Sequence, residues 1–164
     1  MNQINKAFTL IETIIYITLF TLLIGTVFIT AYEIISSSRA LSTRTEIQNE
    51  GNFVIRKINW VMIGAETIIT PAITNSKNLR IIKYDGTKIH ICLDKDKIKI
   101  HEGTYGSCND ANYISLTTDN VSVSDLEFEF IPAVRSGPSG IKAKITITKN
   151  NQDYLFSITK HLRK

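Results

Sequence analysis

The residues Phe8–Ile29 decide the fold, and they read FTLIETIIYITLFTLLIGTVFI. No charged residue lies between Thr13 and Tyr32. An α-helix rises about 1.5 Å per residue, so roughly 20 apolar residues span the ~30 Å hydrocarbon core of a bilayer. The apolar part of a secretory signal peptide is shorter, about 7–15 residues, and a small-residue cleavage site follows it. This run is longer and no such site follows, so we predict a membrane-anchoring helix.

The charges around this run predict its orientation. Lys6 and the amino terminus precede it, and positive charge favours the cytoplasmic side of a membrane. The domain after Ile35 is then extracytoplasmic, and it carries almost all of the charged residues. The net charge of +4 is spread over that domain without a basic stripe, which is more typical of a soluble surface than of nucleic-acid binding.

Glu12 is the exception within the apolar run. An ionised carboxylate at the bilayer centre costs about 2.5–3.5 kcal/mol on insertion scales, and less near the interface. One interpretation places Glu12 at the level of the headgroups, where it is solvated. The other is that it awaits a positive partner from another subunit.

Residues 6–12, KAFTLIE, resemble the processing motif of type IV prepilins and pseudopilins. In that family a short basic leader ends in a small residue, usually glycine, and Ala7 stands at that position here. The resemblance implies that a prepilin peptidase cuts after Ala7 and that Phe8 becomes the methylated N-terminus. It also implies that Glu12 neutralises the free amine of Phe8 on a neighbouring subunit during assembly.

The resemblance also implies an organisation and a set of partners. We expect a leader at 1–7, a transmembrane assembly helix at 8–35 and an extracytoplasmic globular domain at 36–164. The expected partners are other pilin or pseudopilin subunits, the prepilin peptidase and an inner-membrane assembly platform. The protein would first be a single-pass protein of the cytoplasmic membrane and then part of a surface or periplasmic fibre. Whether that fibre is a pilus, a secretion pseudopilus or a competence pilus stays open.

The helical pattern continues beyond the membrane run and becomes amphipathic. Its apolar stripe comprises Leu41, Ile47, Val54, Ile58, Val61, Met62 and Ala65. Spacings of mostly three, four and seven are typical of one face of a helix. No proline precedes Pro71, so we expect the helix to reach about residue 66 and to pack under a sheet. Phe53 and Trp60 are expected in the core or at its edge.

From Leu79 onward the period changes to that of strands. In the later part, Leu126, Phe128 and Phe130 alternate with acidic residues, which predicts strands with one buried face. Asp85-Gly86 is a hairpin signal. The expected strands are 79–84, 88–93, 97–101, 113–116, 121–131, 141–148 and 154–159. We therefore predict an α+β fold, pilin-like, in which a long N-terminal helix packs on an antiparallel β-sheet.

A second, weaker resemblance concerns the later part of the chain. The segments 53–58, 121–130 and 156–163 are similar to the extended helix and closing strands of minor pilins and J-type minor pseudopilins. This similarity implies a minor subunit near the tip of a fibre.

The two cysteines, Cys92 and Cys108, leave three alternatives open. An extracytoplasmic domain favours a disulfide. Free thiols are the second alternative, and a zinc site with His90 and His101 is the third. Zinc sites usually show a C-x₂₋₄-C or H-x₃₋₅-H spacing, which is absent here. A disulfide would pin the loop 102–112, rich in Gly, Ser and Asn, as an exposed contact surface.

The sequence offers no recognisable catalytic arrangement, so we expect a structural protein with no cofactor and no metal, and not an enzyme. Asp94, Asp96 and Asp119 are typical of turns rather than of a calcium loop. Two alternatives remain for the function. One is a pilus-tip module that binds extracellular DNA or a surface ligand, with Lys142 and Lys144 as candidate contacts. The other is a plain single-pass anchored domain.

Overall fold

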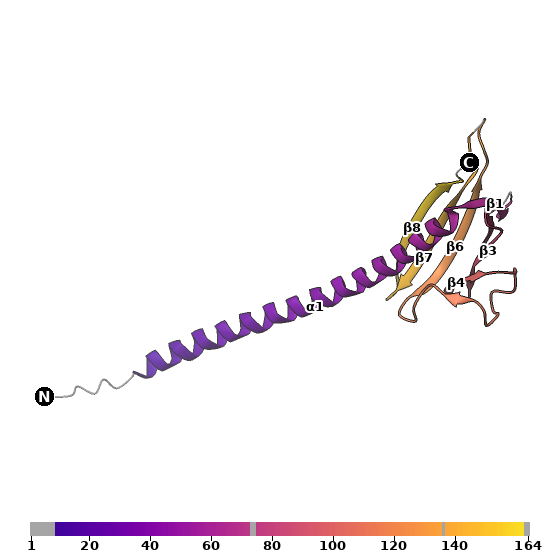
Figure 1. The fold of residues 1–164 in the computed structure, drawn as a ribbon. Coiled ribbons are helices and arrows are strands. Elements are labelled where there is room, and N and C mark those ends of the chain that lie inside the picture. Colours follow the sequence, from indigo (N-terminus) through magenta and orange to yellow (C-terminus); the bar gives the residue numbers. More distant parts are fainter. Residues whose placement is uncertain (1–8, 73–74, 136, 163–164) are drawn as a thin grey trace. The chain divides into compact units, whose positions relative to one another are not determined.

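The computed structural model describes residues 9–72, 75–135 and 137–162 (Figure 1). The processing residues Ala7 and Phe8 lie outside them. The chain divides into two compact units, one ending at Arg44 and one beginning at Thr45. The helix α1, Leu10–Met62, contributes to both of them.

The first unit is the N-terminal part of α1. Of the residues that the structure describes, those of α1 form the one helix that is long and apolar enough to cross a membrane. Its apolar side chains are exposed, from Leu10 (79%) to Phe28 (71%) and Tyr32 (74%). The structure thus has the apolar N-terminal helix that the sequence predicts, and this helix is compatible with a single-pass membrane anchor.

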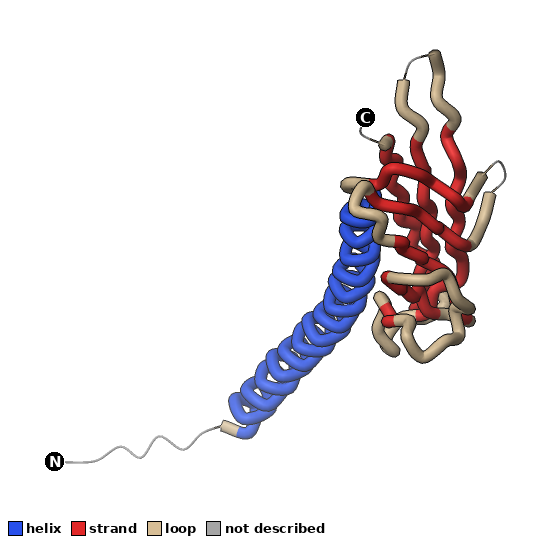
Figure 2. The backbone as a smooth tube through the Cα atoms, turned by 45° about the vertical axis from the view of Figure 1, so that its right-hand side comes forward, coloured by secondary structure: helices blue, strands red, loops and turns tan. Residues whose placement is uncertain are grey.

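The second unit contains the end of α1 and two antiparallel sheets (Figure 2). A five-stranded sheet has the order β1-β2-β3-β4-β5, and a three-stranded sheet has the order β6-β7-β8. The strands are β1 (Ala65–Thr70), β2 (Asn78–Lys83), β3 (Lys88–Asp94), β4 (Lys97–Glu102), β5 (Ile114–Ser115), β6 (Ser122–Ile131), β7 (Gly140–Lys149) and β8 (Gln152–His161). The α+β class is confirmed, although the strands form two sheets where one was expected.

The predicted stripe of α1 makes the core of this unit. Ile47, Val54, Ile58 and Val61 are at most 1% exposed and cluster with buried residues of both sheets. Leu41, in the first unit, was expected in the same stripe but is 64% exposed. Burial of each aliphatic side chain stabilises the fold by about 1.5–3 kcal/mol, so this stripe fixes the helix on the sheets.

Gly51 allows the close approach between α1 and the three-stranded sheet. A methyl group added at Gly51 would overlap the ring of Phe156 on β8. An ion pair between Glu46 Oε2 and Lys149 Nζ (2.6 Å) joins α1 to β7 of the same sheet. The packing therefore needs a residue without a side chain at this position.

The helix ends earlier than expected. It stops at Met62, and Gly64 adopts φ +76°, the left-handed conformation in which glycine commonly terminates helices. Ala65, predicted as the last residue of the helical stripe, is buried but begins β1. The expectation of a helix to about residue 66 is thus wrong, and β1 was not predicted.

The later strands agree with the sequence pattern. The Asp85-Gly86 turn joins β2 to β3, with Gly86 at φ +80°. Phe128 and Leu126 of β6 are fully buried, as the alternation predicts. Each strand after β1 overlaps an expected range, with ends that differ by at most two residues.

Candidate functional site

The first candidate site is the apolar part of α1 around Glu12. Glu12 lies in the first turn of the helix, ahead of the charge-free segment. The hydroxyl of Tyr16, four residues on, donates a long hydrogen bond of 3.5 Å to Glu12 Oε1. No close cation is found beside this carboxylate within the described residues. The Glu12 carboxylate is therefore not paired with a cation among the described residues.

The threonines of this segment do not add polarity to its surface. The hydroxyls of Thr18, Thr21 and Thr30 donate to backbone carbonyls three or four residues earlier, at 2.8–3.0 Å. A hydroxyl satisfied by its own helix does not need water, so a threonine is tolerated in hydrocarbon. Glu12, at the start of the apolar run Phe8–Ile29, is therefore the strongly polar side chain of that run.

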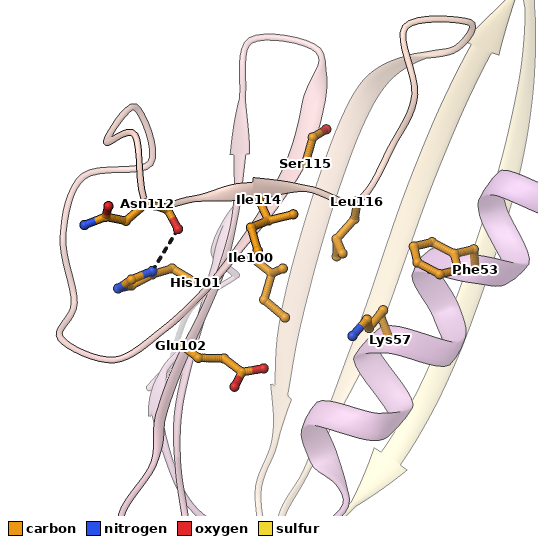
Figure 3. A pocket seen from close by; sticks show the side chains of 9 residues that line it. All are labelled: Phe53, Lys57, Ile100, His101, Glu102, Asn112, Ile114, Ser115 and Leu116. Carbon is orange, nitrogen blue, oxygen red and sulfur yellow. Dashed lines mark hydrogen bonds between the residues drawn. The ribbon is translucent and has the colours of Figure 1, made fainter.

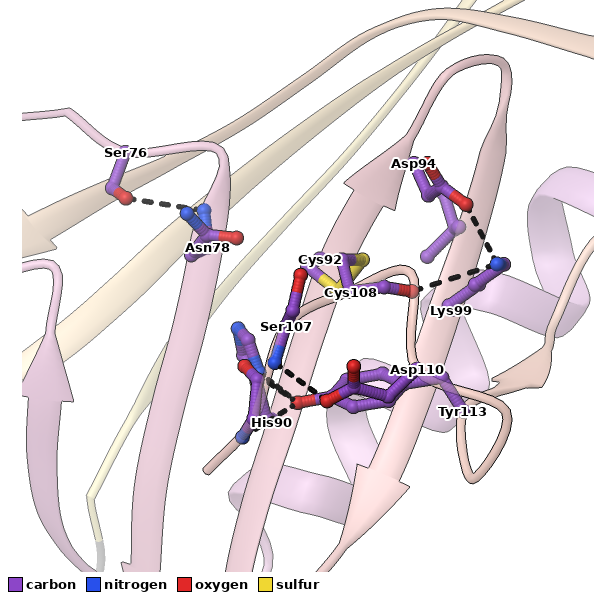
Figure 4. The surroundings of a disulfide bond; sticks show 12 residues. Ser76, Asn78, His90, Cys92, Asp94, Lys99, Ser107, Cys108, Asp110 and Tyr113 are labelled. Atoms are coloured by element: carbon purple, nitrogen blue, oxygen red, sulfur yellow. Dashed lines mark hydrogen bonds and ion pairs between the residues drawn. A yellow bond between two sulfur atoms is a disulfide. The ribbon is translucent and has the colours of Figure 1, made fainter. Parts of the chain in front are cut away.

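The second candidate site is the loop between β4 and β5, pinned by a disulfide. Cys92 on β3 is bonded to Cys108, with their Cα atoms 6.2 Å apart (Figure 4). The disulfide is the first of the three alternatives that the sequence left open. Both sulfurs are used in this bond, so they do not form the zinc site considered as the third alternative.

Tyrosines fasten the same loop to the five-stranded sheet. The hydroxyl of Tyr105 donates to the carbonyl oxygen of Ile81 on β2 (2.7 Å). The Tyr113 hydroxyl contacts both backbone polar groups of Gly106, at 3.1 and 3.2 Å. The loop is thus held at several points and presents a defined surface.

His90 lies buried beneath this loop. Its Nδ1 is 2.6 Å from the Tyr113 hydroxyl, and its Nε2 has no partner among the described residues. The side chain is 2% exposed, and burial lowers the pKa of His90 to about 4, with the positive charges of Arg80 and His101 adding to the effect. His90 is therefore neutral at physiological pH. It faces the same side of β3 as Cys92, as their spacing of two predicts.

His90 belonged to the zinc site that was the third alternative for the cysteines. The structure instead places it as a buried packing residue beneath the loop. Tyr113 was predicted only as part of a strand, and no signal in the sequence linked it to His90. Their pairing depends on the loop folding back over β3.

A cleft of about 530 Å³ lies between α1 and the edge of the five-stranded sheet (Figure 3). Phe53 and Lys57 line it from the helix, and Ile100 and Leu116 line it from the sheet side. Phe53 is 40% exposed, so it lies at the edge of the core, as expected. The cleft can hold an apolar side chain, but it contains no arrangement that indicates a reaction.

The lysines proposed for DNA contact lie among acidic residues. Lys144 on β7 bonds Glu127 on β6 (3.0 Å), and Lys142 lies opposite Glu129. The hydrogen bond from Lys144, followed by one from Asn75, lowers the pKa of Glu127, and the bond to Glu127 raises the pKa of Lys144. The carboxylates would repel a phosphate backbone, so this surface gives the DNA hypothesis no support.

Comparisons with known proteins gave no match, neither to a protein-family model, nor to a curated protein, nor to a solved structure.

Proposed function

We propose that this chain is a subunit of the type IV pilin and pseudopilin class, anchored in the membrane by α1 and assembled into a fibre through the same helix. The observation that carries the proposal is one carboxylate, Glu12, in the first turn of α1, directly before an exposed segment, Thr13–Tyr32, that contains no charged residue. The KAFTLIE motif supports it, because it resembles the processing site of that class.

The physical basis of assembly is charge neutralisation. Cleavage after Ala7 would free the amine of Phe8, whose unperturbed pKa of about 8 makes it cationic. Glu12 of one subunit would pair with this amine on its neighbour. The unassembled anchor carries the penalty of a carboxylate in the membrane, and pairing with the amine would remove this penalty and favour assembly. Removing one half of such a buried pair costs about 3–5 kcal/mol, because the other charge is left without a partner.

The disulfide supports an extracytoplasmic position for the domain. Disulfides persist in oxidising compartments and are rare in the cytosol. The bond between Cys92 and Cys108 therefore agrees with the orientation that Lys6 predicts. In this proposal the domain faces outward on a minor subunit near the tip, and the prepilin peptidase and the inner-membrane platform are partners.

The first test is the N-terminus of the mature protein, determined by mass spectrometry from cells that carry the native processing enzyme. We expect a chain that starts at methylated Phe8. A chain that still starts at Met1 would favour a plain membrane-anchored domain.

The second test is Glu12→Gln, which keeps the size of the side chain and removes its charge. We expect the variant to accumulate in the membrane and to be at least roughly tenfold depleted from purified fibres, since each 1.4 kcal/mol is a factor of ten. Glu33→Gln is the matched control, because Glu33 follows the charge-free segment. Equal amounts of both variants in the fibres would contradict the proposal.

A further inference from the structure

The free edge of the three-stranded sheet is unusually regular. β8 is at the edge in the order β6-β7-β8, and it lies at the border of that sheet in Figure 1. It pairs with β7 over ten consecutive positions, from Gln152↔Lys149 to His161↔Gly140, without a register shift. Within the described residues, the side of β8 that faces away from β7 therefore has no neighbouring strand along its ten residues.

The geometry of the turn between β7 and β8 determines which backbone groups of β8 face away from β7. Asn150 and Asn151 have φ of 52° and 61°, which is the two-residue turn of type I′. In such a hairpin the residues flanking the turn, Lys149 and Gln152, form a hydrogen-bonded pair, and bonded and non-bonded pairs then alternate. The bond from Leu162 N to Ser139 O (2.8 Å) continues this alternation.

The even-numbered residues of β8 therefore bond to β7, and the odd-numbered ones point their N–H and C=O groups outward. The outward residues are Asp153, Leu155, Ser157, Thr159 and His161, and all of them are exposed. A row of backbone donors and acceptors at this spacing is what an added strand pairs with.

The other sheet edges are protected in ways that β8 is not. β1 has two register shifts, and β5 is two residues long. β6 has a register shift after Val123, and the backbone of Phe128 bonds Ser76 in both directions, at 2.8 and 2.9 Å. Bulges, short strands and covering segments are the usual devices against edge pairing. β8 has no proline and no bulge.

The core is also incompletely covered at this edge. Tyr154, Phe156 and Ile158 pack against the core but are only half-buried, whereas Ile145 and Ile147 of the adjacent β7 are fully buried. On the other face, Leu155 is 70% exposed. A fourth strand beside β8 would remove apolar surface from water on both faces.

We propose that β8 accepts an extended segment of a different subunit as a fourth strand. The segment would carry apolar residues at alternate positions, next to Tyr154, Phe156 and Ile158. The charges of the edge add two requirements, a basic residue near Asp153 and an acidic residue near Lys160 and His161. The identification of the donor as a fibre subunit rests on the proposed function. The observation that the edge of β8 is open rests on the strand order and does not depend on that function.

A second copy of this chain is a less suitable donor. Antiparallel pairing of two β8 strands relates the copies by a twofold axis normal to the sheet. The same axis reverses residues 45–62 of α1, which pack on that sheet, so the N-terminal ends of these segments would point in opposite directions. Two chains anchored in one membrane need these ends on the same side.

The test uses the full-length protein with proline at the edge. Ser157→Pro removes an outward N–H that β7 does not use, so the β7–β8 bonds stay and pairing with a further strand is blocked. We expect a melting temperature close to wild type and at least tenfold less protein in purified fibres. Ser157→Ala is the matched control, since it removes the hydroxyl and keeps the N–H, and we expect it at the wild-type level.

If Ser157→Pro lowers the melting temperature, Thr159→Pro is compared with Thr159→Ala instead. Proline variants that enter fibres at the wild-type level overturn the inference. The proposed function fails separately, through Glu12→Gln entering fibres normally.

The donor is identified by a photo-reactive amino acid at position 157. Cross-linked peptides mapped by mass spectrometry should come from an extended segment of another subunit, with the predicted charges at its ends. A cross-link solely to β8 of a second copy overturns the assignment of the donor.

Discussion

Burial lowers the pKa of His90 to about 4, whereas the ordinary value is 6.5. The groups that face it are Arg80 on β2, His101 on β4, and Tyr105 and Tyr113 from the loop, so a proton on His90 would meet positive charge and little solvent. At the scale of a residue, the cluster makes a neutral imidazole part of the packing under the disulfide loop.

This cluster predicts a loss of stability in mild acid. Between pH about 6.5 and about 4 the unfolded chain binds a proton at His90 that the folded chain does not, so the free energy of unfolding falls as the pH falls. We expect His90 to contribute about 2 kcal/mol to the loss between pH 7 and pH 4.5. Urea unfolding of the full chain in detergent at both pH values measures it.

His90→Gln should reduce this difference between pH 7 and pH 4.5, whatever its effect on the absolute stability. His161→Gln is the control, because His161 is exposed on β8 and is not among the groups that face His90. An unchanged pH dependence in His90→Gln would show that the buried imidazole is not the group that titrates.

At the scale of elements, the contact between α1 and β8 depends on Gly51. A glycine inside a helix lowers the stability of that helix by about 1 kcal/mol relative to alanine. In the structure the ring of Phe156 occupies the space that a side chain would need. The glycine that lowers helix propensity therefore improves the packing between elements.

We expect Gly51→Ala to destabilise the domain by a net ~1 kcal/mol. Overpacking lowers the free energy of unfolding by about 1–3 kcal/mol, and the better helix propensity of alanine raises it by about 1 kcal/mol. Chemical unfolding of the full chain measures the change, with the exposed neighbour Asn52→Ala as control. A double variant with Phe156→Leu should recover most of the overpacking cost, and purely additive effects would contradict the contact.

At the scale of the whole molecule, the chain combines a segment suited to lipid with a domain suited to water. The exposed apolar side chains of α1 as far as Ile35 would be unfavourable in water, whereas the domain buries its apolar stripe against two sheets. The anchor and the domain therefore respond differently to an added charge.

Leu22→Lys places a charge near the middle of the charge-free segment. A lysine at the centre of a spanning helix costs about 2.5–3.5 kcal/mol on insertion scales. We expect this variant to be depleted from membranes washed with alkaline carbonate, whereas Ser37→Lys, beyond the span, stays with them. Equal retention of the two variants would mean that the segment around Leu22 does not lie in the hydrocarbon core.

Much of the local structure was predictable because it depends on local periods. The apolar run, the stripe from Ile47 to Val61, and the alternation in β6 all appear in the structure. The end of the helix was missed because the stripe continues to Ala65, although Gly64 carried the signal for termination. β1 was missed because its residues, AETIIT, follow the helix directly and fit the end of the helical stripe.

The sequence by itself determined the apolar run with Glu12 near its start, the α+β class and the positions of most strands along the chain. These follow from composition and from periods of 3.6 and 2, which neighbouring residues set. The tertiary structure decided the division into two sheets, the packing of the Phe156 ring against Gly51, the burial of His90 and the open edge at β8. Each of these depends on pairing between residues far apart in the chain, which many sequences of the same pattern could arrange differently.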